Sequence, residues 1–370
     1  MMVIAAFLFI GCCLYLTGLA VITVALSRIQ TIVSAGKAPI TVIVAARNEE
    51  KTIADCLESL MNQDYPPELF EVIVVDDRSD DATADVLARF KTIMPNLKII
   101  GITSAPPGIS PKKHALATAV REARGELILQ TDADCIVPPQ WASLMAECFT
   151  ENVGMVAGIS PYRAEPGALN SFIRHEYLWN AALAAGSLAL GYGTHATGRN
   201  LGFRRDLFVK MGGYGSGERV LSGDDTLFLQ LVRRETGYAI VSMTDPSAHI
   251  LTNAPKTFPA FLRQRIRHMS TGRLFSPALI AAGGVIYGFH ILLFVAMIGA
   301  PFSPALLKLF SVVFASKLIA DAYAARQTKR ILGLDVQWGR FVINEALLVA
   351  YMAVMPILGL FVPVRWKENS

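Results

Sequence analysis

Short apolar segments that end in acidic residues constrain the fold of this chain more than any other feature of its sequence. Ile40–Ala46 is β-branched and almost wholly apolar, and the similar segment Phe70–Val75 runs directly into Asp76 and Asp77. Continuous apolar runs of this length are typical of strands that are buried on both faces of a parallel sheet. Segments with helical spacing separate the strands, so the sequence predicts an α/β fold with a doubly wound, mainly parallel sheet.

The alternation of strand and helix continues to about residue 140 and then loosens. Four more strands are expected, at 97–102, 126–131, 154–160 and 238–242, and helices are expected at 49–62, 80–90, 113–123 and 225–234. The strand at 126–131 is followed by Asp132. Ligands of doubly wound sheets bind outside the carboxyl ends of the strands. The acidic residues lie at those ends, and we therefore take them as candidate functional residues.

Apolar segments lie at both ends of the chain, in which hydrophobic residues make up 53% of the sequence. Residues 1–26 contain no charge and are long enough to span the roughly 30 Å hydrocarbon core of a bilayer. A cleaved signal peptide is the alternative, but no basic residue precedes this run, whereas Arg28 and Lys37 follow it. We therefore expect an uncleaved anchor with the globular domain on the cytoplasmic side of the cell membrane.

Three further apolar stretches follow near the C-terminus, at 276–300, 305–320 and 341–364. The middle stretch contains Lys308 and Lys317, so it is either a tilted span whose lysines reach the two interfaces or a helix that lies in the interface. The basic segment 326–340 is expected to be a cytoplasmic loop. Counting the middle stretch gives a multi-pass protein with four spans, although the basic tail at 365–367 weakly opposes this count. The expected domains are an anchor (1–27), a cytoplasmic domain (37–273) and C-terminal membrane helices (276–364).

Charge and cysteine content exclude several classes of protein. The formal net charge is +4, and no long basic run interleaved with aromatic residues indicates a nucleic-acid partner. The five cysteines have no C-x-x-C spacing and suggest neither a zinc site nor a disulfide framework. This usage fits a reducing cytoplasm.

The motif Asp132-Ala133-Asp134 is the strongest candidate for metal binding. Residues i and i+2 of an extended strand point the same way, so both carboxylates could face one ion. Hard oxygen ligands suit Mg²⁺ or Mn²⁺ that is bound mainly through substrate phosphates, and such an ion would neutralise a departing diphosphate. In isolation the motif would be a solvated turn, but after a buried strand we favour the metal site.

Other candidates follow from their places relative to strands and helices. Asp76 and Asp77 are candidate acceptors for a nucleotide base or ribose, and Lys112 is a candidate cation for the base or diphosphate. Asp224 and Asp225 head a helix, where a carboxylate either serves the helix N-terminus or acts as a general base on an acceptor hydroxyl. If that hydroxyl attacks a sugar, direct displacement would invert the configuration at the anomeric carbon of the sugar. The glycine-rich segment 186–202 is a candidate binding loop, and it carries Arg199 and Asn200.

A basic helix is expected near 258–273. Gln264, Arg267 and His268 share one face of it at i, i+3 and i+4 spacing. Arg267 could stabilise a leaving diphosphate. Alternatively, the helix rests on lipid headgroups through its remaining arginines, and both interpretations can hold together. Those arginines are Arg263, Arg265 and Arg273.

Taken in order, these motifs resemble the inverting family 2 glycosyltransferases, which have the GT-A fold. The resemblance covers about residues 39–273. It rests on V-A-A-R-N-E-E (44–50), V-V-D-D-R-S-D-D-A-T (74–83), D-A-D (132–134), G-D-D (223–225) and Q-R-I-R-H (264–268). It implies a nucleotide-sugar donor, usually UDP-linked. The residues that match nucleotide-binding positions of the family are Ala45, Glu49, Asp77 and Lys112.

The resemblance also assigns roles to the later motifs. Asp132 and Asp134 match the metal and donor motif, and Asp225 matches the catalytic base. Gln264 and Arg267 match a Q-x-x-R-W motif, with His268 where the family has Trp.

Within the family, the chain is similar to the ceramide and carotenoid glycosyltransferases. This similarity implies transfer of one sugar to a membrane lipid acceptor. A processive synthase of the poly-N-acetylglucosamine type is the alternative, and the missing Trp and the small number of helices weaken it. A non-catalytic membrane scaffold is the third possibility, although all the expected carboxylates are present.

Overall fold

The computed structural model describes residues 2–29, 37–104, 106–215, 223–270 and 277–361. It divides into two compact units, each of which is assembled from separate parts of the chain. The helical unit consists of Met1–Arg28, Tyr162–Gly186 and Asn253–Ser370, and the sheet unit consists of Ile29–Pro161 and Ser187–Thr252. This division differs from the expected contiguous domain at 37–273, because two segments of that range belong to the helical unit.

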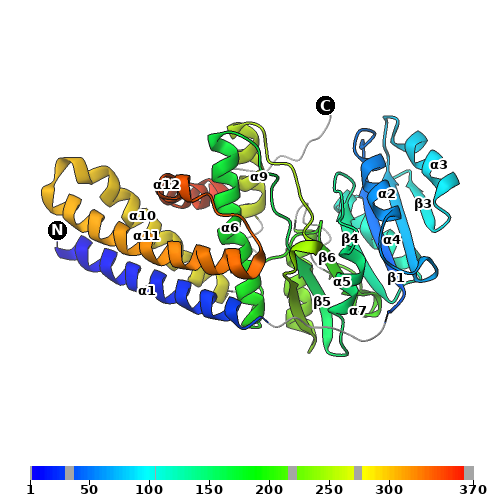
Figure 1. The fold of residues 1–370 in the computed structure, drawn as a ribbon, viewed down its shortest axis with the longest axis horizontal. Helices are drawn as coiled ribbons and strands as arrows, with labels where there is room; N and C mark the ends of the chain where they lie inside the picture. Colours follow the sequence, from blue (N-terminus) through cyan, green and yellow to red (C-terminus); the bar gives the residue numbers. More distant parts are fainter. Residues whose placement is uncertain (1, 30–36, 105, 216–222, 271–276, 362–370) are drawn as a thin grey trace. The chain divides into compact units, whose positions relative to one another are not determined.

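In the described part of the sheet unit, seven strands form one sheet (Figure 1). The strands are β1 (Ile40–Ala46), β2 (Phe70–Asp77), β3 (Leu97–Ile102), β4 (Leu127–Asp132), β5 (Val153–Gly158), β6 (Leu201–Arg204) and β7 (Ala239–Met243). Their order is β3-β2-β1-β4-β6-β5-β7. β6 runs antiparallel to both of its neighbours, and the other pairs are parallel. The expected mainly parallel sheet is thus confirmed, whereas β6 was not predicted because it begins inside the glycine-rich segment.

Helices cover both faces of the sheet, as expected for a doubly wound fold. Alternate residues of each strand point to opposite faces, so Val42 and Val44 join one core and Ile43 joins the other. The first core contains α2 (Ile53–Met61), α3 (Thr83–Ile93) and α5 (Trp141–Glu147). The second contains α4 (Pro111–Glu122), α7 (Arg205–Lys210) and α8 (Asp224–Glu235).

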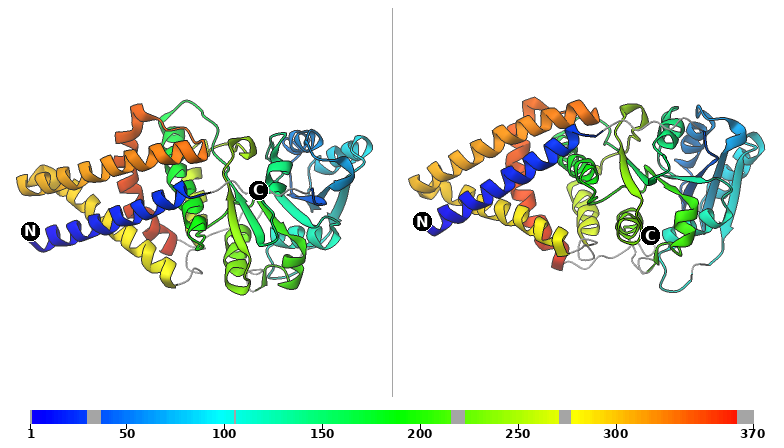
Figure 2. Two further views of the ribbon diagram at one scale, coloured as in Figure 1. Left: turned by 60° about the horizontal axis from the view of Figure 1, so that its bottom comes forward. Right: turned by 90° about the horizontal axis from the view of Figure 1, so that it is seen from below.

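The helical unit contains α1 (Met2–Ser27), most of α6 (Ala168–Ala189), α9 (Phe258–Ser270), α10 (Pro277–Gly299), α11 (Pro304–Leu332) and α12 (Phe341–Phe361). Figures 1 and 2 show α1, α10 and α11 side by side. Within the described ranges, three helices are long and apolar enough to cross a membrane: Ala5–Ser27, Pro277–Phe302 and Trp338–Gly359. The more highly charged α11 is not among these three, so the expected four spans stay a prediction.

α11 differs from its predicted form in two ways. It is 29 residues long and continues through the first part of the expected loop at 326–340. It ends before Gly333, whose φ of +64° is the left-handed conformation that glycine adopts readily at a helix C-terminus. Lys308 is exposed, but Lys317 is fully buried. The expectation that both lysines reach an interface was therefore wrong for Lys317, because carboxylates inside the unit pair with it.

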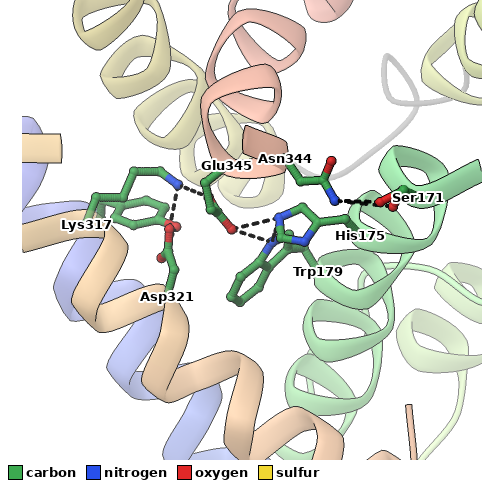
Figure 3. A network of polar contacts seen from close by, with 8 residues as sticks. Ser171, His175, Trp179, Lys317, Asp321, Asn344 and Glu345 are labelled. Atoms are coloured by element: carbon green, nitrogen blue, oxygen red, sulfur yellow. Dashed lines mark hydrogen bonds and ion pairs between the residues drawn. The ribbon is translucent and has the colours of Figure 1, made fainter. Parts of the chain in front are cut away.

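Those carboxylates belong to a buried polar network that joins four helices (Figure 3). Lys317 of α11 donates to Asp321 Oδ2 and to Glu345 Oε2 of α12, each at 2.5 Å. The Tyr15 hydroxyl of α1 donates to Asp321 Oδ1 (2.7 Å), and Glu345 Oε1 lies 2.8 Å from His175 Nε2 of α6. Buried charges are tolerated when they are paired and hydrogen-bonded, and here the pairing spans helices that are far apart in the sequence.

Candidate functional site

The carboxyl edge of the sheet brings together residues from three strands. β1 pairs with β2 on one side and with β4 on the other. Ala46 lies opposite Asp76, and Ala45 lies opposite Asp132. Ala45, Asp76, Asp77 and Asp132 therefore share one edge of the sheet, where ligands of α/β folds bind.

The metal motif is formed by a turn and not by an extended strand. β4 ends at Asp132, and Ala133 and Asp134 lie in a turn in which the N–H of Cys135 donates to the Asp132 carbonyl (3.1 Å). We assumed from the sequence that Asp132 and Asp134 are residues i and i+2 of an extended strand and therefore point the same way. That assumption was wrong. The turn nevertheless places a carboxylate oxygen of Asp132, one of Asp134 and Cys135 Sγ within 4.8 Å of one another.

The donor set of this turn fits a hard divalent cation. Burial raises the pKa of Cys135 to about 12, and the Asp132 and Asp134 charges add to the effect. The thiol is therefore protonated at neutral pH and lies as a donor 3.5 Å from Asp134 Oδ1. Two carboxylates remain to hold Mg²⁺ or Mn²⁺, which commonly complete their coordination with water and substrate phosphates.

Two cations face Asp132. α4 begins at Pro111, which places Lys112 in its first turn, and Lys112 Nζ lies 2.8 Å from Asp132 Oδ1. Arg199 Nε lies 4.0 Å from Asp132 Oδ2. Both cations are partly exposed, so the same side chains can reach an anionic group held beside Asp132. The structure thus brings together Lys112, Arg199 and Asp132, which were named from the sequence as separate candidates.

Asp225 is tied to the loop that carries Arg199. Its Oδ2 accepts the N–H of Gly198 (2.7 Å), and its Oδ1 accepts the N–H of Thr226 (2.6 Å). α8 begins at Asp224 after Gly223, whose φ is +75°. The predicted base is thus linked through one loop to the cation beside Asp132. The side chain of Asp224 lies outside the described part of the structure.

Glu49 belongs to the same acidic region of the sheet unit. Burial raises its pKa, a hydrogen bond from Thr52 Oγ1 (2.6 Å) opposes this, and the charges of Asp134 and Asp132 raise it further. Glu49 follows the end of β1 at Ala46 by three residues, on the carboxyl side of the sheet. Its predicted role in nucleotide binding stays a prediction.

The two acidic residues at the end of β2 are engaged locally. Both oxygens of buried Asp77 accept from Arg78, at 2.8 Å from Nε and 3.2 Å from Nη2. Asp76 Oδ1 accepts the N–H of Ser79 (3.2 Å). Arg78 has a φ of +59°, which is uncommon for a residue other than glycine and marks a tight turn. If Asp77 also accepts a hydrogen bond from a nucleotide, its carboxylate must contact the nucleotide and Arg78 at the same time.

Asn200 does not fit its predicted role as a ligand-binding residue. Its exposed fraction is 0%, and its Oδ1 accepts from Trp141 Nε1 (2.9 Å). Its Nδ2 donates to the carbonyls of Ile159 and Ala248, each at 2.9 Å. The amide holds three segments together and is closed to solvent. We therefore correct this assignment. The sequence did not reveal the burial of Asn200, because the residues around it in a glycine-rich loop have no periodic pattern that distinguishes buried from exposed side chains.

The basic helix is present as α9, which contains Gln264, Arg267 and the exposed His268. It belongs to the helical unit, whereas the carboxylates belong to the sheet unit, so their convergence stays a prediction. Arg265 is buried, so the expectation that it rests on headgroups was wrong. Arg273, the last arginine of that expectation, lies outside the described residues.

The structure shows two contacts near the site that were not predicted from the sequence. Cys135 follows the metal motif directly, and this adjacency was an available signal. Gly198 contributes a backbone N–H to Asp225, which no pattern of side chains could reveal.

The fold and the acidic edge together define a class of protein, the GT-A sugar transferases. The family model described as glycosyl transferase family group 2 matches residues 127–362, which is more than half of the chain, and that of glycosyl transferase family 2 matches residues 41–212. The chain belongs to the family 2 glycosyltransferases.

A solved structure supports the fold assignment. The chain is similar to the mannosyltransferase PcManGT from Pyrobaculum calidifontis, solved in complex with GDP-Man and Mn²⁺, with a TM-score of 0.63, 21% identity and coverage of 97% of each chain. At this identity the likeness shows the fold alone, and the expected GT-A fold is confirmed.

Curated relatives match over shorter segments. The chain is 29% identical over 233 residues to the probable glycosyltransferase YdaM of Bacillus subtilis, covering 62% of this chain and 54% of that one. It is 33% identical over 99 residues to the beta-monoglucosyldiacylglycerol synthase of Synechocystis sp., covering 27% of this chain and 20% of that one. The matches thus span about half of the first relative and a smaller share of the second.

Proposed function

We propose that this protein is an inverting, metal-dependent glycosyltransferase that moves a sugar from a nucleotide sugar, most simply a UDP-sugar, to a hydroxyl of a membrane lipid. One observation carries the proposal: the metal-motif turn, two cations and the loop anchored by Asp225 gather at the carboxyl edge of the sheet. A donor diphosphate is anionic, and this edge offers both cations and a site for a divalent ion.

Each group has a defined part in transfer. A divalent ion held by Asp132 and Asp134 supplies charge neutralisation for the leaving diphosphate when it is bound. Lys112 and Arg199 add positive charge on the same side. Asp225 takes the proton of the acceptor hydroxyl as the new bond forms at the anomeric carbon, and the diphosphate leaves from the opposite face. Gln264, Arg267 and His268 of α9 bind the diphosphate and the acceptor.

The membrane acceptor is supported by two observations. Three described helices are long and apolar enough to cross a bilayer, and one relative is by name a synthase of a glucosylated diacylglycerol. The basic residues that follow α1 favour a catalytic side in the cytoplasm. We propose a multi-pass protein of the cell membrane that acts on lipid of the inner leaflet.

A donor screen with purified full-length protein tests this function. Release of nucleoside diphosphate is measured for UDP- and GDP-sugars, with membrane lipid extract as acceptor and with Mg²⁺, Mn²⁺ or EDTA. We expect one radiolabelled sugar to move into a discrete lipid product in a reaction that EDTA stops and either metal restores. A ladder of product lengths would instead identify a processive synthase, and no turnover with any donor would favour a scaffold.

Asp225→Asn tests the assignment of the base. Asparagine keeps one side-chain oxygen that can accept the N–H of Gly198, so the loop contact is retained, whereas the N–H of Thr226 loses its side-chain acceptor and proton removal is lost. We expect transfer to fall by about 10²–10⁴-fold with unchanged nucleotide binding and a small decrease in melting temperature, because one backbone N–H loses its acceptor. Full activity in this variant would refute the assignment.

A further inference from the structure

α9 presents two neighbouring faces with different partners. Phe261 and Arg265 are one turn apart, so they lie on the same face of the helix. Phe261 is fully buried in a core with Phe172 of α6 and Leu348 of α12. Arg265, at 7% exposure, is buried beside it. Of the residues that the proposed function assigns to the diphosphate, Gln264 and Arg267 lie on the adjacent side of α9, and the exposed His268 lies two turns beyond Phe261.

Arg265 is held by a contact that is both charged and directional. Its Nη2 lies 2.5 Å from Glu176 Oε2 of α6. Its guanidinium lies over two rings, 5.2 Å from the centroid of Phe261 and 5.9 Å from that of Tyr162. A planar guanidinium is suited to such stacking and pairing, which a lysine could not reproduce.

Glu176 is held in turn from its other oxygen. Its Oε1 accepts from Asn180 Nδ2 (2.7 Å) on the same helix and from the Tyr351 hydroxyl (3.3 Å) of α12. Both oxygens of this buried carboxylate are thus engaged, and α6, α9 and α12 meet at one ion pair. A carboxylate fixed on both sides defines where its partner must lie.

An ion pair at this position can fix the rotation and the axial position of α9, that is, its register against α6 and α12. Apolar contacts are non-directional, so packing of Phe261 by itself permits rotation or sliding of α9. A shift of one residue turns a helix by about 100°. Such a shift would leave Arg265 and Glu176 buried without each other, which is strongly unfavourable.

We propose that Arg265 and Glu176 are positioning residues for sugar transfer, because their buried ion pair sets the rotation and register of α9 and thereby aims Gln264, Arg267 and His268 at the donor diphosphate. The inference rests on the proposed function. It assigns the pair no contact with donor or acceptor, so its effect on catalysis passes through α9.

Substitution of the whole pair separates positioning from stability. Replacing a buried ion pair by apolar residues of similar volume is often neutral or stabilising, whereas removing one partner is costly. We expect Arg265→Met and Glu176→Met singly to lower both the melting temperature and kcat. The double variant should regain most of the melting temperature that the single variants lose, although Asn180 and Tyr351 still lack their acceptor. Its kcat should stay at least about 10-fold lower than that of the wild type, with little change in KM, because the misaimed groups act on the leaving diphosphate in the transition state.

Arg326→Met is the control, since Arg326 is an exposed arginine of the same unit, on α11, and no binding role is assigned to it. It should change neither melting temperature nor kcat. Arg265→Lys gives a second measure that does not depend on the double variant folding. It keeps the charge without the planar fork, and we expect a folded protein with a severalfold lower kcat and an unchanged KM.

Two outcomes would overturn the inference in distinguishable ways. If the double variant has the stability and the kcat of the wild type, the pair is merely structural and the proposed function stands. The same conclusion follows if a folded Arg265→Lys variant has the kcat of the wild type. A wild-type protein that transfers no sugar from any donor would remove the proposed function and this inference with it.

Discussion

Arg199 and Asn200 are neighbours in one loop of the sheet unit, yet their side chains do different things. Arg199 is partly exposed beside Asp132, whereas Asn200 is buried and hydrogen-bonded to three segments. Gly158 accommodates the buried amide, because a Cβ there would lie 2.2 Å from side-chain atoms of Asn200. The carboxamide thus supports the loop that presents the cation.

We expect Asn200→Ala to destabilise the protein by about 3 kcal/mol, because it leaves the Trp141 N–H and two buried carbonyls without partners. Arg199→Ala should leave the melting temperature nearly unchanged and lower the transfer rate. Thermal unfolding and initial rates of both variants check this. A stable but inactive Asn200→Ala protein would restore the ligand-binding role that we withdrew.

A second residue-scale prediction concerns pH and buried Glu71 of β2. Its Oε2 accepts from Thr41 Oγ1 (2.7 Å) and from the N–H of Arg124 (2.9 Å), and its Oε1 accepts from Arg124 Nε (2.9 Å). Burial by itself raises the pKa of Glu71, but the hydrogen bonds from Arg124 and Thr41 outweigh it and lower the pKa below its usual value. The ionised form is therefore the one that the fold stabilises.

A lowered pKa in the folded state adds stability above the unfolded pKa of about 4.3, and this stability is lost as the pH falls through the folded value. We expect the difference in melting temperature between the wild type and Glu71→Gln to be largest near neutral pH and to shrink below about pH 4.3. Melting curves from neutral to acid pH measure it. A difference that stays constant with pH would contradict the role of the charge.

At the scale of elements, α6 connects the helices of its unit through two adjacent side chains. His175 contacts Glu345 in the network around Lys317, and Glu176 contacts Arg265 of α9. Successive residues of a helix point about 100° apart, so the two side chains serve different neighbours. α6 thereby joins the apolar helices to the helix that bears the predicted diphosphate ligands.

The two lysines of α11 provide a matched test of this network. Lys317→Met leaves Asp321 and Glu345 buried without their cation, and loss of one partner of a buried pair costs about 3–5 kcal/mol. Lys308 is exposed on the same helix, and Lys308→Met should change nothing. Thermal unfolding in detergent compares the variants. Equal melting temperatures would mean that the carboxylates find other partners or protons.

At the scale of the whole molecule, both compact units are discontinuous in the sequence. α6 lies between β5 and β6 along the chain, yet Tyr162–Gly186 packs within the helical unit. The core residues Phe172, Phe261 and Leu348 come from α6, α9 and α12 and share one cluster. A cut that follows the expected domain boundaries therefore divides this core.

We expect a fragment of residues 37–273 to aggregate when it is expressed alone without detergent. It keeps α6 and α9 but loses α12, so the apolar surface around Phe172 and Phe261 is exposed, together with Glu176 without Tyr351. Size-exclusion chromatography of the fragment and of the full chain in detergent tests this. A monodisperse, folded fragment would show that the boundaries at 37 and 273 define an independent domain.

Much of the fold could be predicted because its strands and helices follow from the residue patterns of short segments of the sequence. Strands β1 and β3 have the predicted bounds, and the acidic residues that end β2 and β4 lie at the sheet edge as expected. The antiparallel β6 was missed, since four residues in a glycine-rich context carry little periodicity. Metal-motif residues were identified correctly as neighbours, although a turn and not a strand brings them together.

The sequence by itself determined the alternation of buried strands and helices, the acidic residues at strand ends and the apolar segments, because each depends on the burial and spacing of residues close along the chain. Only the tertiary structure decided which polar side chains face a ligand and which hold the protein together. Asn200, Arg265 and Lys317 resemble surface or binding residues in the sequence, yet each is buried against partners from distant segments. Such pairing depends on where the backbone places two remote atoms, and no local pattern encodes that distance.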